Sequence, residues 1–149
     1  MHDAVTVHMD APPERVWELV SDVTQIGRYS PETFEAEWLD EATGPAVDAR
    51  FRGHVKRNGK GPTYWTTCTV LASEIGREFA FGIGPADKPL SVWRYRLEPA
   101  GDGTDVTESF ALARIPLLRL YWALLGWARG PTNRNGMRTT LERIKAEVE

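Results

Sequence analysis

The segment from residue 32 to residue 112 constrains the fold most, because apolar and polar residues alternate along it and turn signals interrupt it at short intervals. Such alternation is typical of strands that bury one face. Asn58-Gly59 is a hairpin signal, and Gly44-Pro45 and Gly101-Asp102-Gly103 mark further turns. Connections this short favour an antiparallel meander over a parallel sheet. The pattern predicts six strands, over 33–40, 49–57, 62–73, 78–83, 90–97 and 104–112.

The N-terminal segment predicts one more strand and two short helices. Residues 4–9 alternate like the later strands. Pro12 and Pro13 suit the first turn of a short helix, because a missing N–H costs nothing there. The apolar stripe of that helix consists of Val16, Trp17, Leu19 and Val20. A second short helix or turn is predicted over 23–29, and Ser30-Pro31 ends it because the residue before proline avoids the helical region.

The C-terminal segment predicts helix in two pieces. Ile115–Trp127 is apolar nearly all round, and Gly130-Pro131 is predicted to interrupt the helix after it. The helix then resumes over 133–148 with one apolar stripe, which consists of Met137, Leu141, Ile144 and Val148.

These elements together predict an α+β domain with a helix-grip arrangement. A seven-stranded antiparallel sheet cannot bury its inner face alone, and only the C-terminal helix is large enough to cover it. The two short helices follow the first strand. Aromatic side chains diverge on a concave surface, so we expect a hydrophobic cavity between the curved sheet and the helix. No linker or repeat divides the chain, which predicts a single domain over 1–149.

Composition and the N-terminal residues limit the expected binding partners and cellular location of the protein. The net charge is −3, which argues against nucleic acid, since nucleic acid requires a concentrated basic surface. Cys68 is the only cysteine, so no internal disulfide can form. The first residues do not resemble a secretory signal, and a cytoplasmic location is the expectation.

The N-terminal motif resembles the START-like superfamily, also called SRPBCC, and in particular its polyketide cyclase/dehydrase and lipid-transport branch. The segment 5–32 carries the pattern, and Gly103-Thr104, the run 106–108 and the closing segment 136–149 also fit it. The matching motif positions are Ala11, Pro12, Val16, Trp17, Asp22, Ser30 and Pro31. The resemblance implies a cavity that binds lipids, polyketides or other ring-containing molecules, and some members of the superfamily are cyclases or hydrolases. It does not select among these functions.

No pattern in the sequence indicates a metal or a cofactor. His2, His8 and His54 lie in separate segments, whereas a zinc site needs three or four converging ligands. Cys68 lies in mid-strand without a histidine near it in sequence, which is typical of a small buried hydrophobe. No nucleophile elbow, phosphate loop or dinucleotide-binding glycine pattern occurs. We expect no cofactor and no metal.

Glu108 is the most informative ionisable residue, because it shares a strand face with Val106 and Phe110. If that face is concave, burial raises the pKa of the Glu108 carboxyl group unless it forms an ion pair with a cation such as Arg94 or Arg52. Glu108 could then act as a general acid or base, or anchor a ligand. Because structural ion pairs are more frequent than such sites, we expect Glu108 to lie in an ion pair near the sheet rim or on the outer face.

The alternation in the strand over 90–97 predicts which of its side chains face the cavity. Trp93, Tyr95 and Leu97 share one face and Arg94 and Arg96 the other, so the aromatic face should point inward. The strand over 63–71 is ambiguous, because either Trp65 with two threonines or Tyr64 with Cys68 and Val70 could face the cavity. The predicted ligand-binding residues are Phe51, Trp65, Phe81, Trp93, Arg94, Tyr95, Glu108 and Phe110.

The segment 115–127 has thirteen residues and is too short to span a bilayer, which takes about twenty residues. It could be a lipid-facing entry helix, with Gly130-Pro131 as a hinge. An apolar helix of this length is usually buried within the protein or in a homodimer interface, so we expect no stable membrane insertion.

Three functions remain open. The first is a non-catalytic protein that binds a hydrophobic small molecule, with Glu108 and Arg94 orienting its polar groups. The second is a cyclase or dehydratase that acts on a polyketide-like substrate, with Glu108 or Tyr95 in acid–base work. The third is a homodimeric interaction module whose cavity is filled by its own aromatic side chains. The few polar residues expected at the cavity favour binding.

Overall fold

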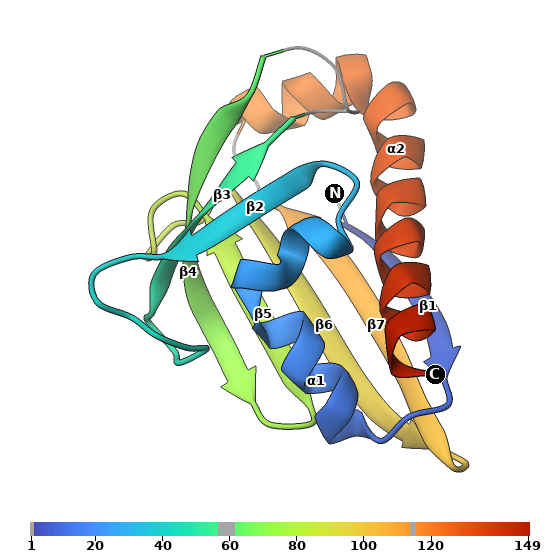
Figure 1. Ribbon diagram of the computed structural model, residues 1–149. Coiled ribbons are helices and arrows are strands. Elements are labelled where there is room, and N and C mark those ends of the chain that lie inside the picture. Colours follow the sequence, from blue (N-terminus) through green and yellow to red (C-terminus); the bar gives the residue numbers. More distant parts are fainter. Residues whose placement is uncertain (1, 57–61, 114–115) are drawn as a thin grey trace.

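The computed structural model describes residues 2–56, 62–113 and 116–149 (Figure 1). Seven strands, two α-helices and one 3₁₀ helix follow each other along these residues. Their bounds are β1 His2–Met9, α1 Pro13–Ser21, η1 Val23–Arg28 (the 3₁₀ helix), β2 Thr33–Trp38, β3 Arg50–Val55, β4 Tyr64–Glu74, β5 Glu78–Ile83, β6 Ser91–Ala100, β7 Gly103–Leu112 and α2 Pro116–Val148. The predicted Asn58-Gly59 turn lies outside the described residues.

The seven strands form one antiparallel sheet in the order β1-β7-β6-β5-β4-β3-β2. The strands β2 to β7 are a meander, as their short connections predict. The first strand lies beside the last one, because α1 and η1 carry the chain from β1 to the opposite edge of the sheet. The predicted α+β helix-grip class is therefore confirmed.

The sheet curves around the helices and buries its concave face against them (Figure 1). The second part of α2 runs along β1 and β7, and α1 lies over β5 and β6. The predicted stripe on α2 supplies Met137, Leu141 and Ile144 to the core, where all three are buried. The inward side chains of the strands and the apolar stripe of α2 thus pack together in one hydrophobic layer.

The helix α2 corrects one prediction, because its backbone continues through Gly130 and Pro131 instead of stopping there. Figure 1 shows that its first part lies at a steep angle to the part that runs along the sheet. A proline inside a helix removes one N–H donor and usually produces a kink, which a helix held by tertiary contacts survives.

The side chains of 117–119 and 121–131 lie outside the described residues. The homodimer interface predicted over 115–127 therefore stays a prediction. Within the residues that the structure describes, no helix is both long enough and apolar enough to cross a membrane.

Candidate functional site

A pocket of about 230 Å³ lies between the concave face of the sheet, the segment from η1 to β2 and the helix α2. Aromatic and aliphatic side chains form much of its wall, namely Ile26, Phe51, Val55, Phe81, Ile83, Trp93, Phe110, Leu112 and Met137. Small or polar residues complete it, among them Ser30, Thr33, Gly53, Thr66, Cys68, Ser91, Asn133 and Thr140. An apolar concavity with a few polar groups is the usual form of a small-molecule site.

Six of the eight residues predicted for the site line this pocket: Phe51, Phe81, Trp93, Tyr95, Glu108 and Phe110. The register of the sheet brings them together, because Phe81 pairs with Trp93 and Trp93 pairs with Phe110 across neighbouring strands. The rings of Trp93 and Phe110 lie 4.8 Å apart, and those of Phe51 and Phe81 lie 5.1 Å apart. Whether these side chains contact a ligand stays a prediction.

Glu108 lies on the pocket wall at mid-strand, and only 4% of its surface is exposed. Tyr95 is its direct neighbour across β6 and β7, and a side-chain hydrogen bond joins the two residues. The second carboxyl oxygen, Oε2, is buried and has no hydrogen-bond partner. Burial raises the pKa of Glu108 to about 8, although the hydrogen bond from Tyr95 opposes this rise.

The ion pair expected for Glu108 is absent from the described residues, so that prediction is wrong. Arg94 follows the opposite face of β6 and pairs with Glu78, and Arg52 pairs with Glu37. Both arginines therefore lie on the convex side of the sheet, because neighbouring residues of a strand point to opposite faces. The expected role of Arg94 in orienting a ligand is corrected by the same observation.

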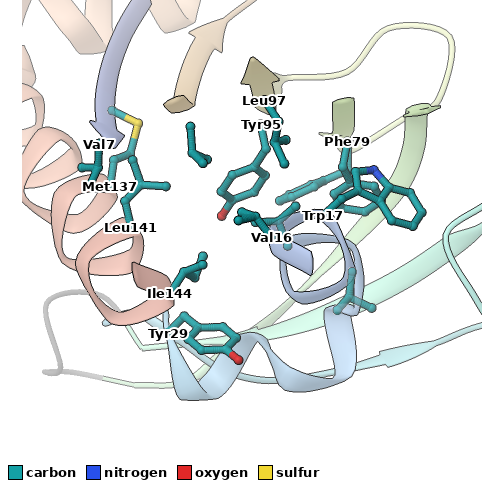
Figure 2. Close-up of a cluster of buried hydrophobic side chains, with 14 of the residues drawn as sticks. Val7, Val16, Trp17, Tyr29, Phe79, Tyr95, Leu97, Met137, Leu141 and Ile144 are labelled. Atoms are coloured by element: carbon teal, nitrogen blue, oxygen red, sulfur yellow. The ribbon is translucent and has the colours of Figure 1, made fainter. Parts of the chain in front are cut away.

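Tyr95 is buried and points from β6 into the space between the sheet and α2 (Figure 2). Burial and the neighbouring Glu108 carboxyl raise its pKa well above the ordinary value for tyrosine. The phenol therefore remains protonated at physiological pH and acts as a hydrogen-bond donor to Glu108.

The ambiguity of β4 is resolved, because Tyr64, Thr66 and Cys68 line the pocket. Trp65 is 42% exposed and points the other way, which corrects its predicted place in the pocket wall. Its ring stacks on His54 at 4.1 Å and lies 4.2 Å from the Arg52 guanidinium carbon on the convex face. Both faces of this strand carry an aromatic residue, so alternation alone could not select the inner one.

Two parts of the pocket wall were not predicted from the sequence. The segment that joins η1 to β2 contributes Ser30, Pro31 and Glu32, and α2 contributes Asn133 and Thr140. Ser30 and Pro31 belong to the N-terminal family motif and to a predicted helix end, but neither observation places them at a cavity. Thr140 lies next to the core stripe of α2, one turn after Met137.

Cys68 is a buried thiol whose pKa burial raises to about 12, so it is not a ready nucleophile. Across the part of the chain that the structure describes, no three His, Cys, Asp or Glu side chains gather into a possible metal site. Among the described residues, the polar groups that line the pocket are therefore those of Glu108, Tyr95, Glu32 and Tyr64, with a few further hydroxyl and amide groups.

Solved structures of similar shape span nearly the whole chain. A protein from Thermus thermophilus matches with a TM-score of 0.73 and 19% identity over 99% of this chain and 97% of its own. A protein from Chromobacterium violaceum matches with a TM-score of 0.67 and 20% identity over 100% of this chain and 98% of its own. At these identities the likeness shows the fold alone.

A polyketide cyclase-like protein from Corynebacterium glutamicum is 26% identical, with a TM-score of 0.60 over 99% of this chain and 88% of its own. No curated protein matches the chain. The family model described as polyketide cyclase/dehydrase and lipid transport matches residues 3–149. The resemblance seen in the N-terminal motif is thereby confirmed, and the chain belongs to the family of polyketide cyclase/dehydrase and lipid transport proteins.

Proposed function

We propose that this protein binds a hydrophobic, ring-containing small molecule in the pocket between the sheet and α2. One observation carries the proposal: the unpartnered Oε2 atom of Glu108 is buried at the wall of a largely apolar pocket. A buried polar atom without a partner costs about 1–3 kcal/mol of stability. A ligand group that completes this hydrogen bond would recover that cost and gain orientation from it.

The aromatic wall supports a flat ligand. Phe51, Phe81, Trp93 and Phe110 meet edge-on or tilted, so their rings present both faces and edges to the pocket. Removing apolar ligand surface from water contributes about 25 cal/mol per Å². A ring system therefore gains most of its binding free energy from these walls, and the polar pair of Glu108 and Tyr95 fixes its orientation.

Filling the pocket tests the proposal directly. Thr66 faces the pocket, whereas Thr67, the next residue of β4, is exposed on the convex face. Thr66→Phe should abolish binding of N-phenyl-1-naphthylamine, an uncharged probe that fluoresces in apolar surroundings. The matched control Thr67→Phe should bind the probe like the wild type.

Thermal unfolding of both variants checks that each one is folded. Equal probe binding by wild type and a folded Thr66→Phe protein would refute the pocket as the binding site. Native mass spectrometry of the purified wild type adds a second measurement, in which a bound small molecule should be lost from Thr66→Phe and retained by Thr67→Phe.

Acid–base catalysis on a polyketide-like substrate is the second candidate. It is favoured by the pKa of about 8 at Glu108, because a catalytic acid or base works best when its pKa is near the operating pH. Glu108→Gln should then remove conversion of a bound substrate while leaving binding of a neutral ligand in place. Conversion that persists in this variant would leave only the binding role.

A further inference from the structure

We infer that the pocket selects an uncharged ligand whose carbonyl group accepts a hydrogen bond from Glu108, and that it rejects the same skeleton carrying a carboxylate. This inference rests on the proposed function and specifies its ligand. It follows from three features of the pocket: the Glu108–Tyr95 pair, the unpartnered carboxyl oxygen, and the kinds of charge that line the wall.

The Glu108–Tyr95 pair offers a donor to the pocket. Tyr95 has one hydroxyl proton, and its hydrogen bond to Glu108 uses that proton. A protonated carboxyl group has one O–H donor, and Oε2 is the oxygen left without a partner. An O–H group in an apolar pocket is complemented by an acceptor that brings no charge, such as a ketone or ester carbonyl.

The rest of the described wall carries no cationic side chain that would pair with an anion. Besides Glu108 and Tyr95, its titratable residues are Glu32 before β2 and Tyr64 and Cys68 on β4. The described side chains of α2 contribute the uncharged polar groups of Asn133 and Thr140. No lysine, arginine or histidine is among the described residues that line the pocket. A carboxylate would lose its hydration there without gaining a counter-charge.

A cationic amine is the competing ligand class, because it would pair with an ionised Glu108. Burial opposes that state, since it holds the carboxyl group protonated at neutral pH. Binding an amine would therefore require a proton to leave Glu108, whereas binding a ketone would not. The two classes consequently differ in how their affinity changes with pH.

Three probes with one skeleton separate these classes: 2-acetylnaphthalene, 2-naphthoate and 2-naphthylmethylamine, measured by isothermal titration calorimetry on the wild type. At about pH 6.5, where Glu108 is protonated, the ketone should bind at least about tenfold more tightly than the carboxylate. At about pH 9.5 the ketone should lose about tenfold in affinity, because the donor proton is gone.

The variant Glu108→Gln keeps an N–H donor and carries no charge at either pH. It should bind the ketone at both pH values and lose the pH dependence, and its thermal unfolding shows whether it is folded. Glu98→Gln, an exposed position on β6, is the matched control and should keep the wild-type pH profile.

Each other result has a defined meaning. A carboxylate that binds as tightly as the ketone overturns the inference, and so does an amine that binds most tightly with an affinity that rises with pH. If N-phenyl-1-naphthylamine binds and the ketone does not, the inference fails while the proposed function stands. If no probe binds at all, the proposed function itself fails.

Discussion

The two ends of the space between the sheet and α2 are built from the same two layers but differ in packing. At one end, α1 packs Val16 and Trp17 against the sheet, where they join Phe79, Leu97 and Leu141 in a filled core (Figure 2). At the other end the segment from η1 to β2 faces the sheet in place of α1, and among the described residues the wall combines large rings with small residues. The pocket lies at this second end.

The comparison shows that a void on the concave face of a sheet forms where the opposite layer lacks side chains large enough to fill it. Aromatic rings on a concave sheet need complementary side chains opposite them to close the gaps. The packed end has these side chains from α1 and from the last turns of α2. Among the described residues of α2 that line the pocket, Gly136 and Thr140 are small and leave space there.

The largest expected effect compares two phenylalanines on β5. Phe79 is fully buried at the packed end, and Phe81 lines the pocket with 9% exposure. Phe79→Ala should lower the free energy of unfolding by about 3–5 kcal/mol, because it leaves a cavity in a filled core. Phe81→Ala should cost about half as much, because part of its ring already faces a void. Urea denaturation measures both values, and equal costs would contradict the distinction between the two ends.

The second prediction concerns the pH dependence of stability that arises from Glu108. Its pKa is about 8 in the folded protein and near 4.5 for an ordinary glutamate. Below about pH 4.5 both states are protonated, and stability is then lost as pH rises towards 8, because the unfolded chain releases the proton first. In that window the loss should be about 1.4 kcal/mol per pH unit.

Glu108→Gln should remove this contribution to the pH dependence. The difference in unfolding free energy between variant and wild type should therefore grow in favour of the variant from about pH 5 to about pH 8 and then level off. Urea titrations at intervals of pH measure it. A difference that stays constant across the window would show that Glu108 is not buried as a neutral acid.

The smallest effect concerns two glycines. Among the described residues, a Cβ atom on Gly136 would approach Pro31 alone, at 3.7 Å, whereas one on Gly103 would lie 2.3 Å from the Met9 carbonyl oxygen. Gly136→Ala should stabilise the protein by about 0.5–1 kcal/mol, because alanine favours the helix and the pocket has room. Gly103→Ala should instead lower the melting temperature. Thermal unfolding distinguishes the two, and a destabilised Gly136→Ala protein would show that α2 is tightly packed at the pocket.

Local sequence patterns predicted most of the strands and several of the inward faces. On β6 the alternation of Trp93 and Tyr95 with Arg94 correctly placed the aromatic residues on the concave side. On β4 the pattern failed to select a face, because Tyr64 and Trp65 are adjacent and both aromatic. Periodicity identifies a face only when its two sides differ in polarity.

The surroundings of Glu108 could not be predicted, because they depend on how β6 and β7 are aligned. Tyr95 lies directly opposite Glu108 in the observed register. A shift by one residue would bring Arg94 there, but it would set the apolar face of one strand against the polar face of the other. A shift by two residues keeps both inner faces and would bring Trp93 or Leu97 opposite Glu108, and alternation within each strand does not choose between these registers.

The amino-acid sequence by itself determined the order of the elements, the alternation that gives most strands an inner face, and the family motif at the N-terminus. Only the tertiary structure decided the register of β6 and β7, the course of α2 through Pro131, and which carboxyl oxygen remains unpartnered. The reason is physical: periodicity reflects neighbours within a few residues, whereas these features depend on contacts between segments that are distant in the chain.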